Sequence, residues 1–164
     1  MQIAIDIDNK QVGKLLQRLQ RRGHNLRPVL GEIGEILLTS IERNFAAAGR
    51  PHKWPASGRV KRGGGQTLTD TGRLRRSFTR KIGNDQVAIG TNVEYAAALH
   101  FGAKVGPHII KPKHGKALFW PGAAHPVKQV RHPGFTLPAR PFLMVQDDDW
   151  PKIRRAVERH LTRG

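Results

Sequence analysis

Residues 28–48 read PVLGEIGEILLTSIERNFAAA, and this stretch decides the fold. Its Val, Leu, Ile and Phe residues recur at helical spacing and form a wide apolar stripe along one side. A proline is tolerated in the first turn of a helix, where its missing N–H has no intrahelical acceptor, so Pro28 favours a start near Asn25 or Leu26. The sequence therefore predicts a long helix that runs to about Ala48 and forms the spine of the hydrophobic core.

A second amphipathic helix is predicted at the C-terminal end of the chain. The acidic cluster 147–149 suits the positive end of a helix, and either Asp147 or Asp148 is expected to cap it, with Pro151 in its first turn. Its predicted apolar face consists of Trp150, Ile153, Val157 and Leu161.

The N-terminal residues predict a strand followed by a helix. Ile3, Ile5 and Ile7 alternate with polar or small residues, which is the period of a half-buried strand. Apolar residues then fall at helical spacing over 10–22, and Gly23 is expected to end this helix. The opening lacks the features of a signal peptide, and no run of about 18 apolar residues occurs, so we expect neither a cleaved leader nor a membrane span.

The part of the chain that follows the long helix is rich in basic residues, glycine and proline. Residues 49–66 combine glycine, proline and cations without an apolar period, and they predict a long, flexible basic loop with Trp54 as its anchor. A short helix is expected over 69–78, with Leu74 and Phe78 facing inward and the arginines facing outward.

Strands and one more short helix are predicted in the centre of the chain. A strand follows the turn at 83–85 and ends at Gly90. Residues 94–102 read EYAAALHFG, which predicts a short helix that is closed by Gly102. From 105 to 135, short apolar and basic runs separated by Pro, Gly and Lys predict a β-rich insert with the form of a small antiparallel meander.

Together these elements predict a single α+β domain over residues 1–164. A chain of 164 residues can bury a hydrophobic core without disulfides or metal ions. Helices at both ends are expected to pack on a small, mostly antiparallel β-sheet, with the long basic loop on the surface. The chain contains no cysteine, which excludes disulfides, thiolate metal sites and cysteine nucleophiles and fits a reducing cytosol.

The net charge is the most unusual property of the chain. It has 29 Lys and Arg residues against 12 Asp and Glu residues, a formal net charge of +17, and no acid between Tyr95 and Gln146. Such a surplus attracts phosphate or acidic partners, although a solvated positive face is the simpler interpretation. The expected basic contact surface consists of Arg59, Lys61, Arg62, Arg73, Arg75 and Arg76.

No catalytic or metal-binding pattern emerges from the sequence. The histidines lack the helical spacing of metal ligands, and no carboxylate lies among those between His100 and His132. Helix capping explains the acidic cluster 147–149, and the serines lie outside any nucleophile motif. We therefore expect a non-enzymatic protein with no cofactor, no metal and no small-molecule substrate.

Five motifs occur in order along the chain. They are the loop around Trp54, LTDTGRLRRSF at 68–78, VAIGT at 87–91, EYAAALHFG at 94–102 and PARPFL at 138–143, which precedes the last helix. In this order they resemble the phage virion morphogenesis family, which includes tail-completion proteins of contractile-tailed phages. The TG-x-L-x-x-S element also resembles a group of head–tail neck proteins. The resemblance spans roughly residues 33–161.

This resemblance implies a structural protein that completes the tail or the head–tail junction. It implies a closed ring of copies of the chain, hexameric by analogy, which acts in the host bacterial cytoplasm during assembly and then in the virion. Other tail or neck proteins are the implied partners, with transient DNA contact and no membrane. The motif positions that carry over as structural or assembly residues are Trp54, Thr71, Gly72, Leu74, Ser77, Gly90, Tyr95, Gly102, Pro138, Arg140, Pro141 and Phe142.

Several alternatives stay open at the level of the sequence. Tail completion, tail termination and a neck role fit the motifs equally, and the basic surface suits DNA as well as an acidic protein. The alternative function is that of a basic protein that binds nucleic acid without sequence specificity, for which the charge itself is sufficient.

Overall fold

The computed structural model describes residues 14, 17, 19–20 and 23–162. The strand predicted at 3–7 and nearly all of the helix predicted at 10–22 lie outside these residues. The contacts divide the chain into two compact units: unit 1 comprises Met1–Val93 and Phe142–Gly164, and unit 2 comprises Glu94–Pro141. The single domain predicted for the whole chain stays a prediction, and the predicted β-rich insert lies inside unit 2.

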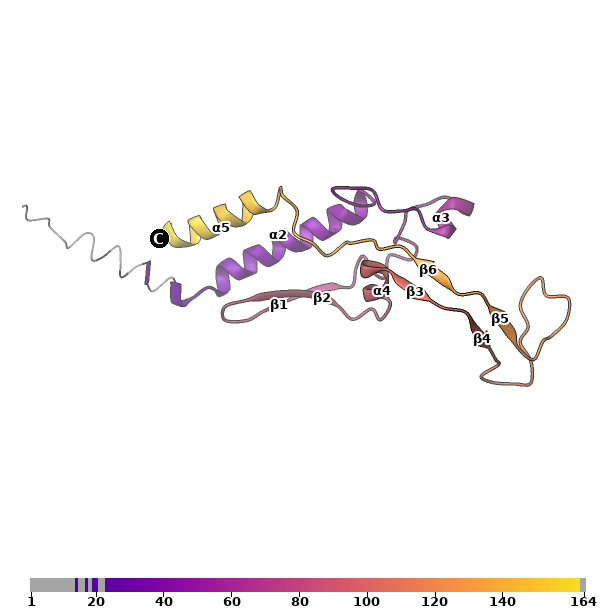
Figure 1. Ribbon diagram of the computed structural model, residues 1–164. Coiled ribbons are helices and arrows are strands. Elements are labelled where there is room, and N and C mark those ends of the chain that lie inside the picture. The colour runs from indigo at the N-terminus through magenta and orange to yellow at the C-terminus, as the bar shows by residue number, and fades with distance from the viewer. Residues whose placement is uncertain (1–13, 15–16, 18, 21–22, 163–164) are drawn as a thin grey trace, which may run out of the picture. The chain divides into compact units, whose positions relative to one another are not determined.

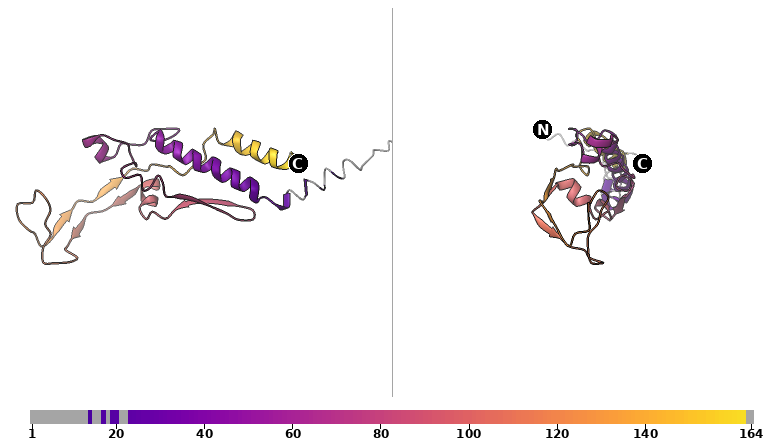
Figure 2. Two further views of the ribbon diagram at one scale, coloured as in Figure 1. Left: turned by 180° about the vertical axis from the view of Figure 1, so that it is seen from behind. Right: turned by 90° about the vertical axis from the view of Figure 1, so that its right-hand side faces the viewer.

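Helix α2, Arg27–Ala46, is the centre of unit 1. It begins after Leu26 with a proline in its first turn, as predicted. The C-terminal helix α5, Trp150–Thr162, packs against one side of α2, and the hairpin of β1, Phe78–Ile82, and β2, Val87–Thr91, packs against another (Figure 1). The two helices lie side by side in an antiparallel arrangement (Figure 2).

The hairpin consists of β1, Phe78–Ile82, and β2, Val87–Thr91. Its antiparallel register runs from Phe78 opposite Thr91 to Ile82 opposite Val87. The amide of Gly83 donates to the carbonyl oxygen of Gln86 at 2.8 Å and closes the turn, where the sequence predicted it. Burial alternates along β2, so one face of the hairpin packs inward and the other faces solvent.

The core of unit 1 is built around Phe45 at the end of α2, which is fully buried. Its ring centroid lies 5.5 Å from that of Trp54, 5.9 Å from that of Phe78 and 5.6 Å from that of Phe142. Phe78 also contacts Phe142 edge-on at 5.5 Å. Aromatic rings prefer such tilted or edge-on arrangements to flat stacking, so one cluster joins four segments of the chain.

The segment 49–66 contains a short helix where the sequence predicted only a loop. Helix α3 spans Gly58–Gly63, and the side chain of Ser57 caps it by accepting a hydrogen bond from the amide of Val60 at 3.3 Å. None of the helical residues is buried, which explains why the sequence shows no apolar period over this helix. The flexibility assigned to 49–66 stays a prediction.

The helix predicted over 69–78 is wrong. Residues 70–76 form bends and turns, and Phe78 is already the first residue of β1. Gly72 adopts a φ of +75°, which an α-helix does not allow, and Leu68 also has a positive φ of 61°. The inward position predicted for Leu74 is nevertheless correct, since its side chain is only 3% exposed.

In unit 2, helix α4, Ala96–Phe101, precedes a two-stranded ribbon. The predicted helix and its closure by Gly102, with a φ of +79°, are confirmed. The strands of the ribbon are β3 Ala103–Val105, β4 His108–Ile110, β5 Val130–His132 and β6 Phe135–Leu137. β3 pairs with β6 and β4 with β5, both antiparallel, and a single bridge joins Leu118 to Val127 farther out.

The predicted meander is therefore wrong, because the strands are nested rather than sequential. The run KALFWP contributes only the bridge at Leu118, and residues 106–107 and 133–134 interrupt the ribbon at the same level. A Cβ on Gly134, at a φ of +85°, would lie 2.3 Å from the carbonyl oxygen of Val105, so the interruption requires glycine.

Helix α5 begins where the sequence predicted, but its cap and its buried face differ. The carbonyl oxygen of Asp149, not of Asp147 or Asp148, accepts the first helical hydrogen bonds, from the amides of Lys152 and Ile153 at 3.0 Å. Ala156 is the fully buried residue of the helix. Of the predicted apolar face, Trp150 and Val157 are 49% and 36% exposed, and Ile153 and Leu161 are half-buried.

The mixed α+β class predicted from the sequence is confirmed, with helices and small antiparallel pairings of strands. Among the described residues, no helix is both long and apolar enough to cross a membrane.

Candidate assembly surfaces

Two polar residues are buried on the core side of α2, one turn apart. Ser40 and Asn44 are 1% and 0% exposed. Asn44 donates from Nδ2 to the carbonyl oxygen of Phe142 at 3.0 Å, and its Oδ1 accepts from Nε of Arg50 at 2.9 Å and Nε2 of Gln146 at 3.2 Å. One amide therefore joins α2 to the segment that follows it and to the segment that leads into α5.

Asp149 completes this polar cluster from the start of α5. Its Oδ2 accepts from the hydroxyl of Ser40 at 2.5 Å and from the amide of Gln146 at 3.0 Å, and Oδ1 lies 3.3 Å from the ammonium of Lys152. Burial works against ionisation of Asp149, but the hydrogen bonds from Ser40, Gln146 and Lys152 and the charge of Lys152 outweigh it and lower the pKa of the carboxyl. The carboxylate is thus a structural tie between α2 and α5.

The sequence analysis did not single out Ser40, Asn44 or Gln146. The available signal was the position of Ser40 and Asn44 four residues apart, beside Ile41 and Phe45 on the apolar stripe of the helix. Polar residues on a buried helix face need hydrogen-bond partners, and apart from Arg50 the partners lie about a hundred positions farther along the chain.

Four of the motif residues contribute to the core of unit 1. Trp54 and Phe142 meet at the aromatic cluster, and Leu74 is buried near the start of the hairpin. The hydroxyl of Ser77 donates to the carbonyl oxygen of Leu74 at 2.7 Å and lies 2.5 Å from the hydroxyl of Thr91, which links the turn to β2. Their roles in the structure are internal.

The positions of the motif glycines differ in whether they require glycine. Gly72 and Gly102 have φ values of +75° and +79°, and a Cβ on Gly102 would lie 2.8 Å from the carbonyl oxygen of Leu137. Glycine is needed at both positions because other residues rarely adopt this conformation. A Cβ on Gly90 would meet no atom within 4 Å, so the hairpin itself does not require glycine there.

The remaining motif residues divide into exposed and buried positions. Arg140 is 3% exposed, and burial lowers its pKa from the ordinary value of arginine; its amide donates to the carbonyl oxygen of Leu99 at 3.0 Å. Tyr95 is 46% exposed. Besides Gly90, the exposed motif residues are Thr71, Tyr95, Pro138 and Pro141.

The six residues of the predicted basic surface all lie in unit 1, in two groups. On α3, Lys61 and Arg62 are exposed, whereas Arg59 donates to the carbonyl oxygen of Gln66 at 2.7 Å and pairs with Asp70 at 3.6 Å. In the turn before β1, Arg73 and Arg76 are exposed and Arg75 is half-buried, and Arg76 donates to the carbonyl oxygen of Thr71 at 2.9 Å.

Carboxylates lie close to part of this surface. Arg75 and Arg76 line a hollow of about 270 Å³ together with Glu35 and Glu42 of α2. The acids and the local hydrogen bonds thus offset part of the positive charge that the sequence suggested for this surface.

An apolar groove of about 200 Å³ lies between α2, β2 and the segment that precedes α5. Leu143, Met144 and Val145 form one wall and are 38%, 37% and 39% exposed. The groove is lined by Leu37, Ile41, Val87, Ile89, Leu143, Met144 and Val145. Consecutive exposed apolar residues are unusual on a protein surface and are typical of sites where another protein binds.

Comparison with protein families identifies the chain. The phage virion morphogenesis family matches residues 7–162, which include both units. The chain belongs to this family.

The chain is also similar to a curated protein of nearly the same length. The chain is 29% identical over 157 residues to the Mu-like prophage FluMu G protein 2 of Haemophilus influenzae, with 95% of this chain and 94% of that protein covered. No solved structure matches the chain. Among the described residues of this virion morphogenesis protein, no group of three or more His, Asp or Glu side chains is placed to hold a metal ion.

Proposed function

We propose that this protein completes the phage tail or the head–tail junction as a structural, non-enzymatic part of the assembling virion. The observation that carries the proposal is the match to the phage virion morphogenesis family over almost the whole chain. The similarity to a prophage protein of nearly the same extent supports it. The protein then acts in the host bacterial cytoplasm during assembly and afterwards in the tail or neck of the virion.

We further propose that copies of the protein form a closed ring and that the apolar groove of unit 1 lies in the contact between neighbouring copies. Leu143, Met144 and Val145 are exposed and apolar, and their burial would contribute roughly 25 cal/mol per Å². A ring arises when the contact joins two different surfaces of each copy and the rotation between neighbours closes. Other tail or neck proteins bind the assembled ring.

The test places a charge in the groove and follows particle assembly. In a phage whose own gene is replaced by Met144→Glu, we expect DNA-filled heads and free tails that fail to join, because a carboxylate cannot be buried in an apolar contact. Ala88→Glu is the matched control, since Ala88 lies on β2 with its side chain on the exposed face. Electron microscopy and plaque counts of the induced lysates measure the result.

The outcomes separate the alternatives. Infectious, joined particles from Met144→Glu, with the purified variant folded, would exclude the groove as an assembly contact. Intact particles from a deletion of the whole gene would exclude the assembly role itself. That second result would favour the alternative function, a basic protein that binds nucleic acid without sequence specificity.

A further inference from the structure

The positive charge of unit 2 is not balanced within the unit. Residues Glu94–Pro141 contain seven Lys or Arg residues and a single acid, Glu94. The seven ion pairs found among the described residues all lie in unit 1. Six of the seven cations of unit 2 are exposed: Lys104, Lys111, Lys113, Lys116, Lys128 and Arg131.

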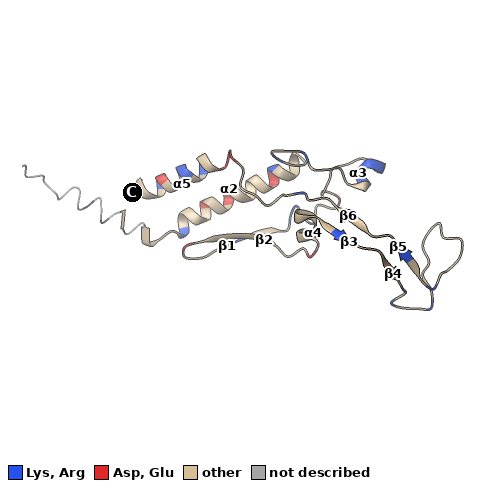
Figure 3. Ribbon diagram, viewed as in Figure 1, with Lys and Arg blue, Asp and Glu red and all other residues tan. Residues whose placement is uncertain are grey.

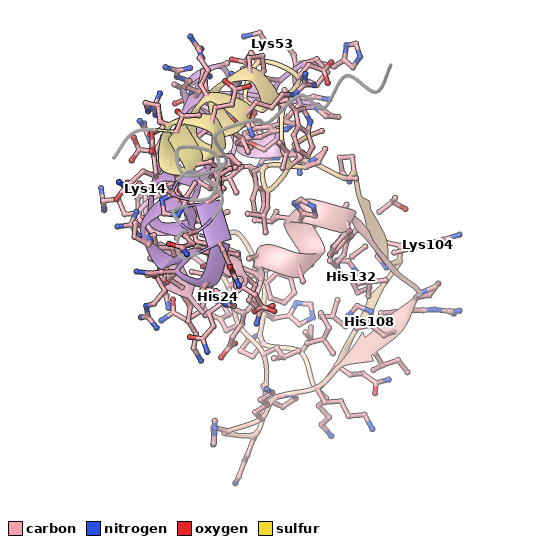
Figure 4. The ribbon with its side chains drawn as sticks, turned by 90° about the vertical axis from the view of Figure 1, so that its left-hand side faces the viewer. Lys14, His24, Lys53, Lys104, His108 and His132 are labelled. Atoms are coloured by element: carbon pink, nitrogen blue, oxygen red, sulfur yellow. The ribbon has the colours of Figure 1, made fainter. Side chains whose placement is uncertain are left out.

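The ribbon of unit 2 has two distinct faces. The rings of His108 and His132 stack across β4 and β5 with centroids 5.0 Å apart, and His132 contacts Phe135 edge-on at 6.2 Å, so these three side chains share one face. Because side chains alternate along a strand, Lys104 and Arg131 lie on the opposite face. Figure 4 shows Lys104 on the side of the ribbon away from the two imidazoles.

The cationic face continues into the loop at the end of the ribbon. Figure 3 shows the basic positions on β3 and β5, and four further lysines lie in the chain that joins β4 to β5. This loop also carries Phe119 and Trp120, which are 67% and 46% exposed. Together with Ile110, Leu118 and Val130, they surround an apolar hollow of about 260 Å³. By the same alternation, Ile110 and Val130 lie on the face of the two imidazoles, so this hollow borders that face and not the cationic one.

We propose that this ribbon binds double-stranded DNA through its cationic face, with Lys104 and Arg131 on phosphates and the lysines of the loop extending the contact. A two-stranded antiparallel ribbon fits the major groove of B-DNA. Lysine is depleted in interfaces between proteins, whereas it is a common ligand of phosphate, so five lysines among seven cations favour a nucleic acid over an acidic protein.

The contact is expected to be independent of base sequence. Lysine and arginine on phosphates release counterions, which supplies affinity but carries no sequence information. The rings of Phe119 and Trp120 line the hollow on the imidazole face of the ribbon and are not expected to take part in this contact. The inference concerns the ribbon alone and does not rest on the proposed role at the head–tail junction, because the purified protein can be tested outside the virion.

The experiment measures binding of the full-length protein to a fluorescent duplex of about 30 base pairs by anisotropy, at salt concentrations from about 0.05 to 0.5 M. The double variant Lys104→Gln with Arg131→Gln removes two exposed charges from the ribbon. Its matched control is Lys61→Gln with Arg62→Gln, which removes two exposed charges from α3 in unit 1 and leaves the same net charge. Thermal unfolding verifies that both variants are folded.

We expect the ribbon variant to bind about 10- to 100-fold more weakly near 0.1 M salt, with a slope of log K against log salt that is smaller by about 2. The control should lose less than about threefold. Trp120→Ala should change neither the affinity nor the slope appreciably, because it removes no charge and lies at the hollow on the opposite face.

Three results would overturn the proposal. The first is no binding to the duplex at about 0.05 M salt. The second is an equal loss of affinity in the ribbon variant and the α3 control, which would mean that only the total charge matters. The third is binding to vesicles that contain phosphatidylserine at salt concentrations where the duplex is not bound, which would assign the ribbon to an anionic lipid surface.

Discussion

The two units of the chain use the same kinds of residues for different purposes. Unit 1 buries its aromatic rings around Phe45 and pairs many of its cations with acids, as at Arg80 with Glu35 and Arg159 with Glu32. In unit 2 the large aromatic residues are exposed, and six of its seven cations lie on the surface of a unit that contains a single acid. The comparison indicates that the residues of unit 1 stabilise its own fold, whereas those of unit 2 lie on its surface, where we propose that the cations contact DNA.

The largest expected difference between the units concerns their aromatic residues. Phe45→Ala should lower the free energy of unfolding by about 3–5 kcal/mol, because it leaves a cavity among three other rings. Phe135→Ala, at a position that is 52% exposed, should change it by less than about 1 kcal/mol. Urea unfolding followed by circular dichroism gives both values, and similar losses would show that unit 2 contributes to stability as unit 1 does.

A smaller effect is expected at the buried carboxylate that ties α2 to α5. Asp149→Asn should cost about 1–3 kcal/mol at pH 7, because Ser40, Lys152 and the amide of Gln146 lose a charged acceptor. Since the pKa of Asp149 is lowered in the folded state, its contribution is complete above the ordinary aspartate value of about 4 and is lost as the pH falls through the lower folded value.

The pH dependence provides a second measurement at the same site. Below about pH 4, urea midpoints of the wild-type protein should fall more steeply than those of Asp149→Asn. Asp85→Asn, in the exposed turn of the hairpin, is the control and should follow the wild type. Parallel curves for all three proteins would contradict the role assigned to Asp149.

The smallest expected change in stability follows the removal of one cation, taken in turn from each unit. Arg80→Gln should lower stability by about 0.5–1 kcal/mol, because its guanidinium pairs with Glu35 and donates to the carbonyl oxygen of Gly31. Arg131→Gln in unit 2 should leave stability unchanged or raise it slightly, since it removes a cation from a cluster of like charges. Differential scanning calorimetry at low salt resolves the two cases, and a loss at Arg131 equal to that at Arg80 would remove the distinction between the units.

The sequence predicts those elements whose signals are local. The apolar stripe and Pro28 locate α2, the turn at 83–85 locates β2, and Gly102 ends α4, because each signal lies within the element that it specifies. The helix predicted over 69–78 from the spacing of apolar residues does not form, because the positive φ of Gly72 is incompatible with a helix. That conformation is set by the surrounding structure and leaves no trace in the spacing of residues.

Contacts between distant segments could not be predicted. The nested pairing of β3 with β6 and of β4 with β5 depends on matching runs that are too short to specify a partner. Besides Arg50, the partners of Ser40 and Asn44 lie in the segment before α5, and no spacing rule connects them. The motif residues were a partial guide to the candidate surfaces: they led to Trp54 and Phe142 in the core but not to the exposed groove residue Met144.

The hydrogen bond between Ser40 and Asp149 also bears on how the protein is made. The two residues are separated by 109 positions, so at about 5–20 residues per second a ribosome adds Asp149 roughly 5–20 seconds after Ser40. During that interval the polar side chains of α2 have only Arg50 among their native partners, and the aromatic cluster lacks Phe142. A chain that stops short of Phe142 cannot close its core, so we expect proteases to remove an incomplete product before it accumulates.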